Sequence, residues 1–467
     1  MVLASRGVRA PRRVLALADD LSGAAETAAA LRIPGRIVLG PAAVPPPADG
    51  EALVLDLDTR HLAADEAARL VRDAVQGVAA PTLMIKKTDS LLRGNLASEA
   101  AAYARGARGV VIAAALPTAG RTVRDGVVHL HGTPLHATDA WRAEAAPVPR
   151  SVRAALGDLP TRSVPLSAVR ASRREFAALL HDLVAAGLCP VCDAETDADL
   201  DAVVAATLHL GPGVRLIGSG GLASALGRVL APALCPEPPP APDAADAPPP
   251  GGARTEDRPL PATEHRPLLV VVGTAEPSAV AQIAQLTAAG AHHTALSADL
   301  LAQNGPPLPF PVDPHGITVV SVDNSRGVRP GSARRVVAGL ARAVAAVDRP
   351  TDLVLTGGET ARRVLDALGI DQLRPVRQIH HGAVHGHTPD GRSVVTRPGS
   401  HGDTGSLLRI ADALRPGQLR TPLLSRPVAA PPAADPSAPG VAFVAPASPP
   451  PETSPPPETS VPQGEIQ

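Results

Sequence analysis

The stretch Val14-Leu-Ala-Leu-Ala-Asp-Asp-Leu-Ser-Gly-Ala24 indicates what kind of fold this chain adopts. Its first five residues form a continuous apolar run, which is typical of a buried strand, and the polar residues after it open a helix. Two carboxylates, Asp19 and Asp20, stand where the strand ends, and they suit a hydroxyl-rich ligand or a metal. Either could act as a general base on a substrate hydroxyl. The alternative is that Asp20 or Ser22 only caps the helix, but a cap does not need both carboxylates.

The same alternation of short apolar runs and longer amphipathic stretches continues along the chain. Strands are expected at residues 14–18, 52–56, 83–86, 109–113, 214–217, 268–272, 317–322 and 353–355. Helices are expected near residues 61–75, 173–186, 198–208 and 332–347, the last with Ser332 as its N-cap. The alternation predicts an α/β fold with largely parallel sheets, in which ligands bind beyond the carboxyl ends of the strands.

Two stretches differ in composition from the rest and predict the domain boundaries. Residues 236–266 are rich in proline and lack apolar periodicity, which predicts an extended linker. Residues 419–467 are rich in Pro, Ala and Ser and predict a disordered tail. Two domains, at residues 10–235 and 267–418, are therefore expected.

Charge and hydropathy exclude several classes of protein. The formal net charge of −1 argues against electrostatic capture of nucleic acid or of an anionic membrane surface. No window approaches the roughly 18 apolar residues of a membrane span, and the apolar run at 14–18 is too short for a signal peptide. A soluble cytoplasmic protein is the expectation. The sequence leaves the oligomeric state open, with a homo-oligomer among the options.

Cysteine usage points to structure rather than to redox or metal chemistry. Cys189-Pro-Val-Cys192 has the spacing of half a zinc or redox site, but no second pair completes it. The stretch also reads as a short buried strand, which is the favoured interpretation. The sequence identifies no metal ligands.

The only two lysines among the 44 basic residues are adjacent, within Ile85-Lys-Lys-Thr-Asp-Ser-Leu-Leu-Arg-Gly-Asn95. Lysine offers a compact ammonium group that the planar fork of arginine cannot always replace. A site for an anionic, hydroxylated ligand is therefore predicted at Lys87, Asp89, Ser90 and Arg93. Arg93 could bind a carboxylate there through two parallel hydrogen bonds. A solvated run of charges is the alternative. Arg60, in the polar stretch that follows residues 52–56, joins this set, although a loop salt bridge would explain it as well.

Glycine-rich turns follow several predicted strands. In Thr356-Gly-Gly-Glu-Thr-Ala361 a buried strand runs into a helix start, which offers free N–H groups and a positive dipole end to a phosphate. A second such loop is Arg397-Pro-Gly-Ser-His-Gly-Asp-Thr-Gly405, and the two together favour a nucleotide site. Gly218-Ser-Gly-Gly-Leu-Ala223 is better explained as a tight turn. Neither loop is a Walker A P-loop, because Gly-x-x-x-x-Gly-Lys-Ser/Thr is absent. No Gly-x-Gly-x-x-Gly fingerprint follows a strand either, which argues against a nicotinamide-dependent oxidoreductase.

Taken in order, these segments resemble one family, the four-carbon acid sugar kinases. The resemblance spans roughly 400 residues and is made up of residues 18–24, 87–95, 117–121 with Gly126, 193–194, 218–223, 273–274 with Gln282, 356–361 and 399–402. It implies a sugar-acid domain followed by an ATP domain, with phosphorylation of threonate, erythronate or a 3-oxo-tetronate at the terminal hydroxyl. ATP and Mg²⁺ are the implied cofactors, and a small sugar acid is the implied partner.

The resemblance also assigns roles to individual residues. Substrate contacts are implied for Asp19, Asp20, Lys87, Asp89 and Arg93, and ATP contacts for Thr274, Gly357, Gly358, Glu359, Thr360 and Gly399. To these the residues themselves add Arg60 and Ser90 as expected substrate contacts, Asp19 or Asp20 as the base, and Gly402 as a further ATP contact. The chain departs from the family pattern at 397–402, at 274–276 and at 378–384, all in the expected ATP domain. A sugar-acid-binding protein with a decayed ATP site is therefore the alternative function.

Overall fold

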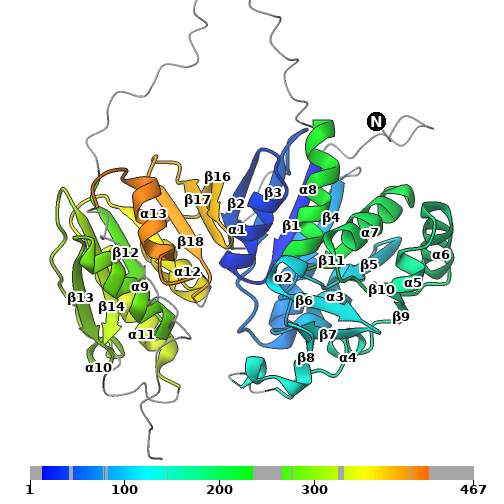
Figure 1. Ribbon diagram of the computed structural model, residues 1–467, viewed down its shortest axis with the longest axis horizontal. Helices are drawn as coiled ribbons and strands as arrows, with labels where there is room; N and C mark the ends of the chain where they lie inside the picture. Colours follow the sequence, from blue (N-terminus) through cyan, green and yellow to red (C-terminus); the bar gives the residue numbers. More distant parts are fainter. Residues whose placement is uncertain are drawn as a thin grey trace, which may run out of the picture. The chain divides into compact units, whose positions relative to one another are not determined.

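The computed structural model describes two long stretches of the chain, which we call the N-terminal half (residues 13–234) and the C-terminal half (residues 266–419) (Figure 1). The described residues are 13–40, 46–76, 78, 82–142, 144, 146–234, 266–274, 277–323, 325, 331–399 and 402–419. The predicted tail beyond Leu419 and the predicted linker, apart from Arg266, lie outside the described residues.

The N-terminal half is built on eight parallel strands in the order β2-β3-β1-β4-β11-β5-β10-β9. The strands are β1 (Arg13–Ala18), β2 (Gly35–Leu39), β3 (Ala52–Asp56), β4 (Thr82–Lys87), β5 (Gly109–Ala113), β9 (Thr161–Val164), β10 (Cys189–Cys192) and β11 (Val214–Gly218). The helices are α1 (Leu21–Ala30), α2 (Ala64–Val75), α3 (Leu96–Ala104), α4 (Val152–Ala155), α5 (Leu166–Val169), α6 (Arg173–Ala185), α7 (Asp197–His209) and α8 (Gly220–Leu234). A separate small antiparallel sheet contains β6 (Arg121–Arg124), β7 (Val127–Leu130) and β8 (Thr133–Pro134).

The C-terminal half has a mixed sheet in the order β13-β14-β12-β15-β18-β17-β16. Its strands are β12 (Leu268–Val272), β13 (His292–Ser297), β14 (Ile317–Asp323), β15 (Asp352–Thr356), β16 (Gln372–His380), β17 (Ala383–His387) and β18 (Ser393–Arg397). Its helices are α9 (Pro277–Ala288), α10 (Ala298–Leu301), α11 (Ala333–Ala345), α12 (Gly358–Ala367) and α13 (Ser406–Leu414). The first five strands of this order are parallel, whereas β17 and β16 are antiparallel additions.

The two halves share one hydrogen-bonded sheet through an antiparallel pairing of β16 with β2. The register joins Gln372 to Val38 and Leu373 to Ile37, and the amide of Leu39 donates to the carbonyl of Asp371 at 2.8 Å. The fold is thus α/β with a large, mostly parallel sheet, as predicted. The division into two domains stays a prediction, because the described residues of both halves belong to one compact unit.

Central strands are buried along their whole length because helices cover both faces of the sheet. Five of the six residues of β1 and all five residues of β12 are buried. Valine, leucine and alanine fill these positions, which fits a chain with three Phe, one Trp and one Tyr. Continuous apolar runs of this kind are what parallel strands require, and this is why the sequence predicted them.

Three local predictions can be compared with the structure. Ser332 does occupy the N-cap position of α11, but its side chain makes no capping hydrogen bond there. Cys189 and Cys192 are buried free cysteines on β10, which confirms the core interpretation. Burial raises the pKa of both thiols, so they stay protonated. The turn interpretation of residues 218–223 fits the packing, because a Cβ on Gly221 would come within 2.5 Å of the Ala115 carbonyl oxygen.

Candidate active site

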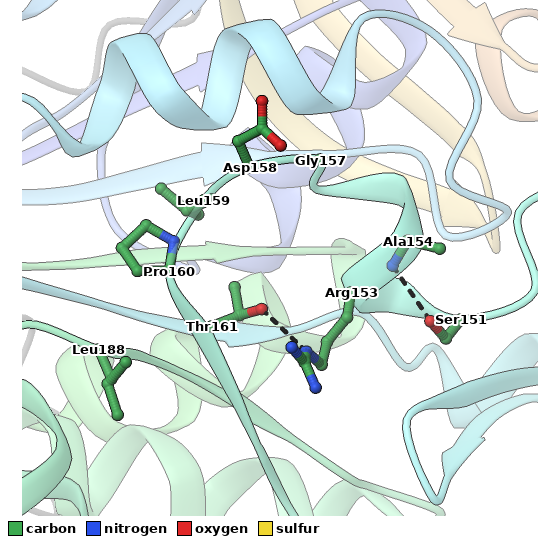
Figure 2. A pocket seen from close by; sticks show the side chains of 9 residues that line it. All are labelled: Ser151, Arg153, Ala154, Gly157, Asp158, Leu159, Pro160, Thr161 and Leu188. Atoms are coloured by element: carbon green, nitrogen blue, oxygen red, sulfur yellow. Dashed lines mark hydrogen bonds between the residues drawn. The ribbon is translucent and has the colours of Figure 1, made fainter.

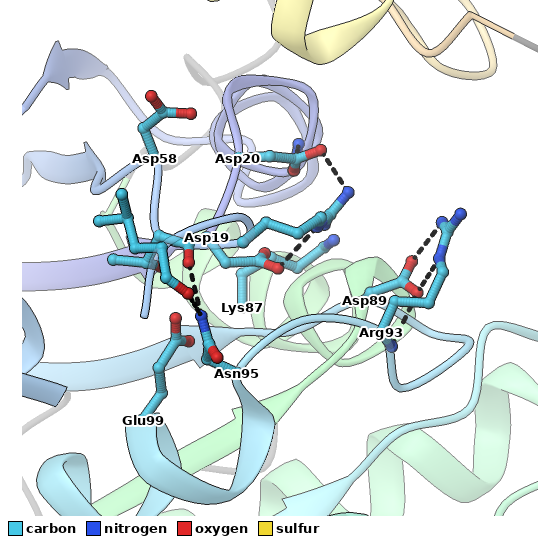
Figure 3. A network of polar contacts seen from close by, with 12 residues as sticks. Asp19, Asp20, Asp58, Lys87, Asp89, Arg93, Asn95 and Glu99 are labelled. Atoms are coloured by element: carbon cyan, nitrogen blue, oxygen red, sulfur yellow. Dashed lines mark hydrogen bonds and ion pairs between the residues drawn. The ribbon is translucent and has the colours of Figure 1, made fainter. Parts of the chain in front are cut away.

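The candidate site of the N-terminal half lies where three neighbouring parallel strands end. Asp19 and Asp20 follow β1, Arg60 lies in the loop after β3, and Lys87 ends β4. Because parallel strands present their carboxyl ends at the same edge of a sheet, side chains far apart in sequence meet there. Figure 3 shows Asp19, Asp20 and Lys87 close together.

Arg60 joins the two adjacent carboxylates. Its Nε lies 2.9 Å from Asp19 Oδ2, and its Nη1 lies 2.7 Å from Asp20 Oδ2. Asp20 is also the N-cap of α1, because its Oδ1 accepts a hydrogen bond from the Gly23 amide at 2.8 Å. The salt-bridge and capping interpretations are therefore both correct for these residues. One carboxylate oxygen of the pair remains available to a ligand, because Asp19 Oδ1 is buried and has no hydrogen-bond partner among the residues that the structure describes.

The two carboxyl groups have pKa values displaced in opposite directions. Burial by itself would raise the pKa of Asp19, but the positive charges of Arg60, Lys86 and Lys87 outweigh it and lower that pKa. For Asp20, burial and the negative charge of Asp19 prevail, so its pKa lies above the usual value of 3.8. A carboxylate with a raised pKa is a stronger base, which is the property that general-base chemistry needs.

The two adjacent lysines have different partners. Lys87 Nζ lies 3.2 Å from Glu26 Oε2 of α1, on the side of the sheet where Asp20 begins that helix. Lys86 Nζ lies 2.6 Å from Glu99 Oε2 of α3, and both of these side chains are almost fully buried. Lys87 therefore belongs to the candidate site, whereas Lys86 is part of the protein interior.

Asp89, Ser90 and Arg93 lie in the loop after β4. Arg93 binds Asp89 with two side-chain hydrogen bonds, Nε to Oδ2 at 2.6 Å and Nη2 to Oδ1 at 3.0 Å (Figure 3). Although Asp89 is buried, these bonds and the charge of Arg60 hold the pKa of its carboxyl well below the usual range. Ser90 Oγ accepts a hydrogen bond from Arg121. Sequence reasoning noted Arg121 but gave it no role.

In the C-terminal half the predicted glycines also gather at the ends of neighbouring strands. Thr274 follows β12, Gly357 joins β15 to α12, and Gly399 follows β18. A Cβ built on Gly399 would lie 3.6 Å from Thr274 Cγ2 and 3.7 Å from Gly357 Cα, so the three turns are in contact. Gly357 has φ +95°, a conformation that favours glycine. The first turn of α12 contains Gly358, Glu359 and Thr360.

The last glycine loop is only partly described. Gly402 has φ +89°, and its carbonyl accepts a hydrogen bond from Gln282 Nε2 at 3.3 Å. Residues 400 and 401 lie outside the described residues, as do residues 275 and 276 of the turn after β12. Arg397 lies buried beneath this loop, where burial lowers its pKa to about 10. It donates to Ser406 Oγ at 2.5 Å, and its Nε has no partner among the described residues. The sequence placed Arg397 at the start of the second glycine loop, where the chain departs from the family pattern, but gave its side chain no role.

The carboxylate site of the N-terminal half and the glycine turns of the C-terminal half meet at the start of α12. A Cβ built on Gly358 would lie 3.0 Å from Ser22 Oγ and 3.1 Å from Asp20 Oδ2. The N–H groups of the first helical turn, which have no partners within the helix, therefore start beside the carboxylate with the raised pKa. One helical turn farther on, Arg362 Nη1 lies 2.9 Å from Asp56 Oδ2, and Arg363 Nη2 lies 2.5 Å from Asp58 Oδ2. Sequence reasoning missed both of these ion pairs, because about 300 residues separate the partners.

Other features of the described residues do not add to the site. A surface hollow of about 530 Å³ is lined by parts of residues 151–161 and by Leu188 (Figure 2), and none of the predicted site residues lines it. Among the described residues, no group of three or more His, Cys, Asp or Glu side chains is arranged to hold a metal ion. No helix in the described part of the chain is long and apolar enough to cross a membrane.

Comparison with protein families gives two matches, one in each half. Residues 14–226 match the family described as a sugar-binding N-terminal domain, and residues 313–407 match a nucleotide-binding C-terminal domain. The first match includes Asp19, Asp20 and Lys87, and the second includes Gly357 and Gly399. The division of the candidate site between the two halves thus follows the two family matches.

Two relatives are similar over most of their length, and a third is similar over about half of its length. A D-threonate kinase from Cupriavidus necator is 33% identical over 417 residues, which cover 84% of this chain and 96% of that protein. A D-threonate kinase from Bordetella bronchiseptica is 30% identical over 426 residues, which cover 85% and 96%. A D-erythronate kinase from Heliobacterium modesticaldum is 30% identical over 234 residues, which cover 47% and 53%.

Two solved structures share the fold. A crystal structure from Haemophilus influenzae aligns with a TM-score of 0.61 at 18% identity, and the alignment covers 85% of this chain and 98% of the other. A Salmonella typhimurium LT2 protein named as a tRNA synthase aligns with a TM-score of 0.64 at 20% identity, with the same coverage. At these identities the likeness extends to the fold alone.

Proposed function

The chain belongs to the four-carbon acid sugar kinase family, and on that premise we propose that it phosphorylates a four-carbon sugar acid with ATP. The acceptor is the terminal hydroxyl, and D-threonate is the first candidate because it is the substrate named for two relatives similar over most of their length. D-Erythronate is the second candidate.

The observation that supports this proposal most directly is the approach of Gly358 to Asp20. A phosphate bound at the start of α12 would face the N–H groups of the first helical turn and the positive end of the helix dipole. The terminal hydroxyl of an acid bound beside Asp20 would then lie next to that phosphate. Phosphoryl transfer depends mainly on such positioning and on charge stabilisation.

Within this proposal the carboxylates have separate tasks. Asp20, whose pKa is raised by burial and by Asp19, accepts the proton of the attacking hydroxyl. Asp19, whose pKa is lowered, stays ionised and fixes Arg60, which in turn orients Asp20. Lys87, Asp89, Ser90 and Arg93 contact the acid. The charge of Lys87 also offsets part of the negative charge that gathers where the phosphoryl group is transferred.

The residues of the C-terminal half fit a nucleotide. The turns at Thr274, Gly357 and Gly399 lie in contact, and the two glycines have no side chain to keep a phosphate chain from their backbone N–H groups. Buried polar atoms without partners lie near these turns, namely Thr356 Oγ1 and Arg397 Nε. Glu359, Thr360 and Gly402 complete the proposed ATP contacts. Mg²⁺, when bound with ATP, would neutralise charge on the phosphates.

The test is ADP release from Mg-ATP in the presence of D- and L-threonate, D- and L-erythronate and the 3-oxo-tetronates. ADP release that depends on one of these acids is expected. If none supports release, calorimetry with each acid and with ATP decides between the remaining outcomes. Binding of an acid without binding of ATP would favour the alternative function, a sugar-acid-binding protein with a decayed ATP site.

A further inference from the structure

Almost every cation of the site is neutralised by a carboxylate of the protein itself. Arg60 pairs with Asp19 and Asp20, Lys87 pairs with Glu26, and Arg93 forms two hydrogen bonds with Asp89. A bound carboxylate would have to compete with these internal partners. The remaining cation beside this loop, Arg121, has no carboxylate partner among the described residues.

Arg121 is held at the rim of the site by its backbone. It begins β6 directly after a tight turn, and its amide and carbonyl both pair with Leu116, at 3.1 and 2.7 Å. The turn requires glycine at position 120, because Gly120 has φ +65° and a Cβ there would lie 2.3 Å from His131 Nδ1. The guanidinium group of Arg121 therefore extends from a constrained hairpin toward the loop that follows β4.

One edge of the Arg121 guanidinium group is used and the other is free. Its Nη1 donates to Ser90 Oγ, whereas its Nε is buried and has no hydrogen-bond partner in the described part of the chain. A buried donor without an acceptor is unfavourable unless a ligand satisfies it. The Nε–Nη2 edge is the fork with which arginine binds a carboxylate through two parallel hydrogen bonds.

We propose that Arg121 is the residue that binds the carboxylate of the sugar acid and so determines which end of the substrate is phosphorylated. This inference rests on the proposed function. Asp20 lies beside Gly358 at the nucleotide end of the site, whereas Arg121 lies beside Ser90 in the loop after β4. An acid held by its carboxylate at Arg121 extends its far end toward Asp20. The hydroxyl farthest from the carboxylate is then the one that reacts.

Burial supports this assignment. It lowers the pKa of Arg121, whereas the pKa of Arg93, bound to Asp89, is raised. The charge of Arg121 is therefore the less compensated of the two, and an arriving anion gains more from it. Arg93 remains a candidate for contacts with the hydroxyl groups, through the Asp89 carboxylate that it orients.

The test compares two substrates and two variants. Arg121→Ala is expected to raise the KM for D-threonate by roughly 10- to 100-fold, with the KM for ATP unchanged. D-Threitol, which has a terminal hydroxyl but no carboxylate, is expected to react poorly and equally with wild type and Arg121→Ala. Arg124→Ala is the matched control, because Arg124 lies on the same strand, is exposed and pairs with Glu195. It is expected to behave as wild type with both substrates.

The outcomes separate this inference from the proposed function. An active wild type whose KM for D-threonate is unchanged by Arg121→Ala overturns the role of Arg121 and leaves the function intact. If Arg121→Ala loses activity equally with D-threonate and D-threitol, Arg121 has a structural role, and its role in binding the carboxylate is overturned. If wild type phosphorylates none of the acids, calorimetry with D-threonate replaces kinetics, and binding that persists in Arg121→Ala contradicts the inference. Arg121→Gln, which keeps the length and polarity of the side chain, replaces the alanine variant if that variant does not fold.

Discussion

Lys86 and Lys87 are adjacent in sequence, but their ammonium groups pair with helices on opposite faces of the sheet. Lys86 reaches Glu99 on α3, and Lys87 reaches Glu26 on α1. The cause is the twofold repeat of a strand, in which successive side chains point to opposite faces. One lysine is therefore a buried structural residue, and the other faces the candidate site.

This relationship predicts different defects for the two lysine variants. Lys86→Met should lower the free energy of unfolding by about 3–5 kcal/mol, because it leaves Glu99 buried without a partner. Lys87→Met should lower kcat/KM for the acid by roughly 10- to 100-fold, because it removes a charge from the site. Urea unfolding and steady-state kinetics measure the two effects. The double variant Lys86→Met/Glu99→Leu should recover most of the lost stability, and failure to do so would contradict the ion-pair explanation.

Asp20→Asn should reduce kcat by roughly 10²- to 10⁴-fold while the helix cap is kept. Asparagine retains the oxygen that accepts the Gly23 amide, so the stability of α1 should change little. Kinetics and thermal melting of the same preparation measure both properties. Asp73→Asn, an exposed aspartate on α2, is the control and should keep full activity. A fully active Asp20→Asn enzyme would remove Asp20 from the role of base.

The pH dependence of the reaction should report on the same carboxyl group. A base must be deprotonated to act, so kcat/KM should fall as the pH is lowered through the pKa of Asp20. Because that pKa is raised, the midpoint of the acid limb should lie above 3.8. A pH profile of wild type measures it. The limb should be absent from the residual activity of Asp20→Asn, and an identical limb in both proteins would assign it to another group.

Two glycines at opposite ends of α12 offer a matched test of the nucleotide site. Gly369 has φ +68°, so alanine there should cost about 1–2 kcal/mol of stability. Gly357 has φ +95° and ψ 129°, a conformation outside the left-handed helical region, so alanine there should cost about 1–3 kcal/mol. Only Gly357 faces the glycine turns, so only Gly357→Ala should raise the KM for ATP as well. Chemical denaturation and kinetics with varied ATP distinguish the two effects. Equal KM values for ATP in the two variants would argue against a phosphate site at the start of α12.

Asp56 should make stability depend on pH. Complete burial raises the pKa of its carboxyl to about 7 although Arg362 lies 2.9 Å away. Between pH 3.8 and 7 the folded state therefore holds a proton that the unfolded state releases. The contribution of this proton to the free energy of unfolding is complete below pH 3.8 and is lost as the pH rises through 7.

The check is urea unfolding of wild type and Asp56→Asn between pH 4 and pH 8. Relative to Asp56→Asn, the free energy of unfolding of wild type should fall by up to about 4 kcal/mol as the pH rises across this range. Both proteins contain the same other titrating groups, so the difference between them isolates Asp56. Parallel curves would mean that the carboxyl of Asp56 is ionised throughout the range.

The sequence by itself determined the central strands of both halves and the glycine turns that follow several of them, and it proposed most residues of the candidate site. It did not predict β2 and β16, the strands through which the two halves pair. Val14–Ala18 and Leu268–Val272 could be recognised as strands because buried parallel strands need unbroken apolar runs. Asp19, Lys87 and Gly357 could be assigned to a site because each follows such a run, and strand ends of a parallel sheet converge. These are local patterns, and local patterns are readable in a single sequence.

Only the tertiary structure decided which polar groups neutralise one another. The sequence assigned the carboxylate to Arg93, but the structure binds the fork of Arg93 to Asp89 and leaves the Nε of Arg121 without a partner. It also joined Arg362 to Asp56 across 306 positions, a pairing with no local signal. Whether a charge is free to bind a ligand depends on packing between elements distant in the chain. The spacing of residues along a single chain does not record that packing.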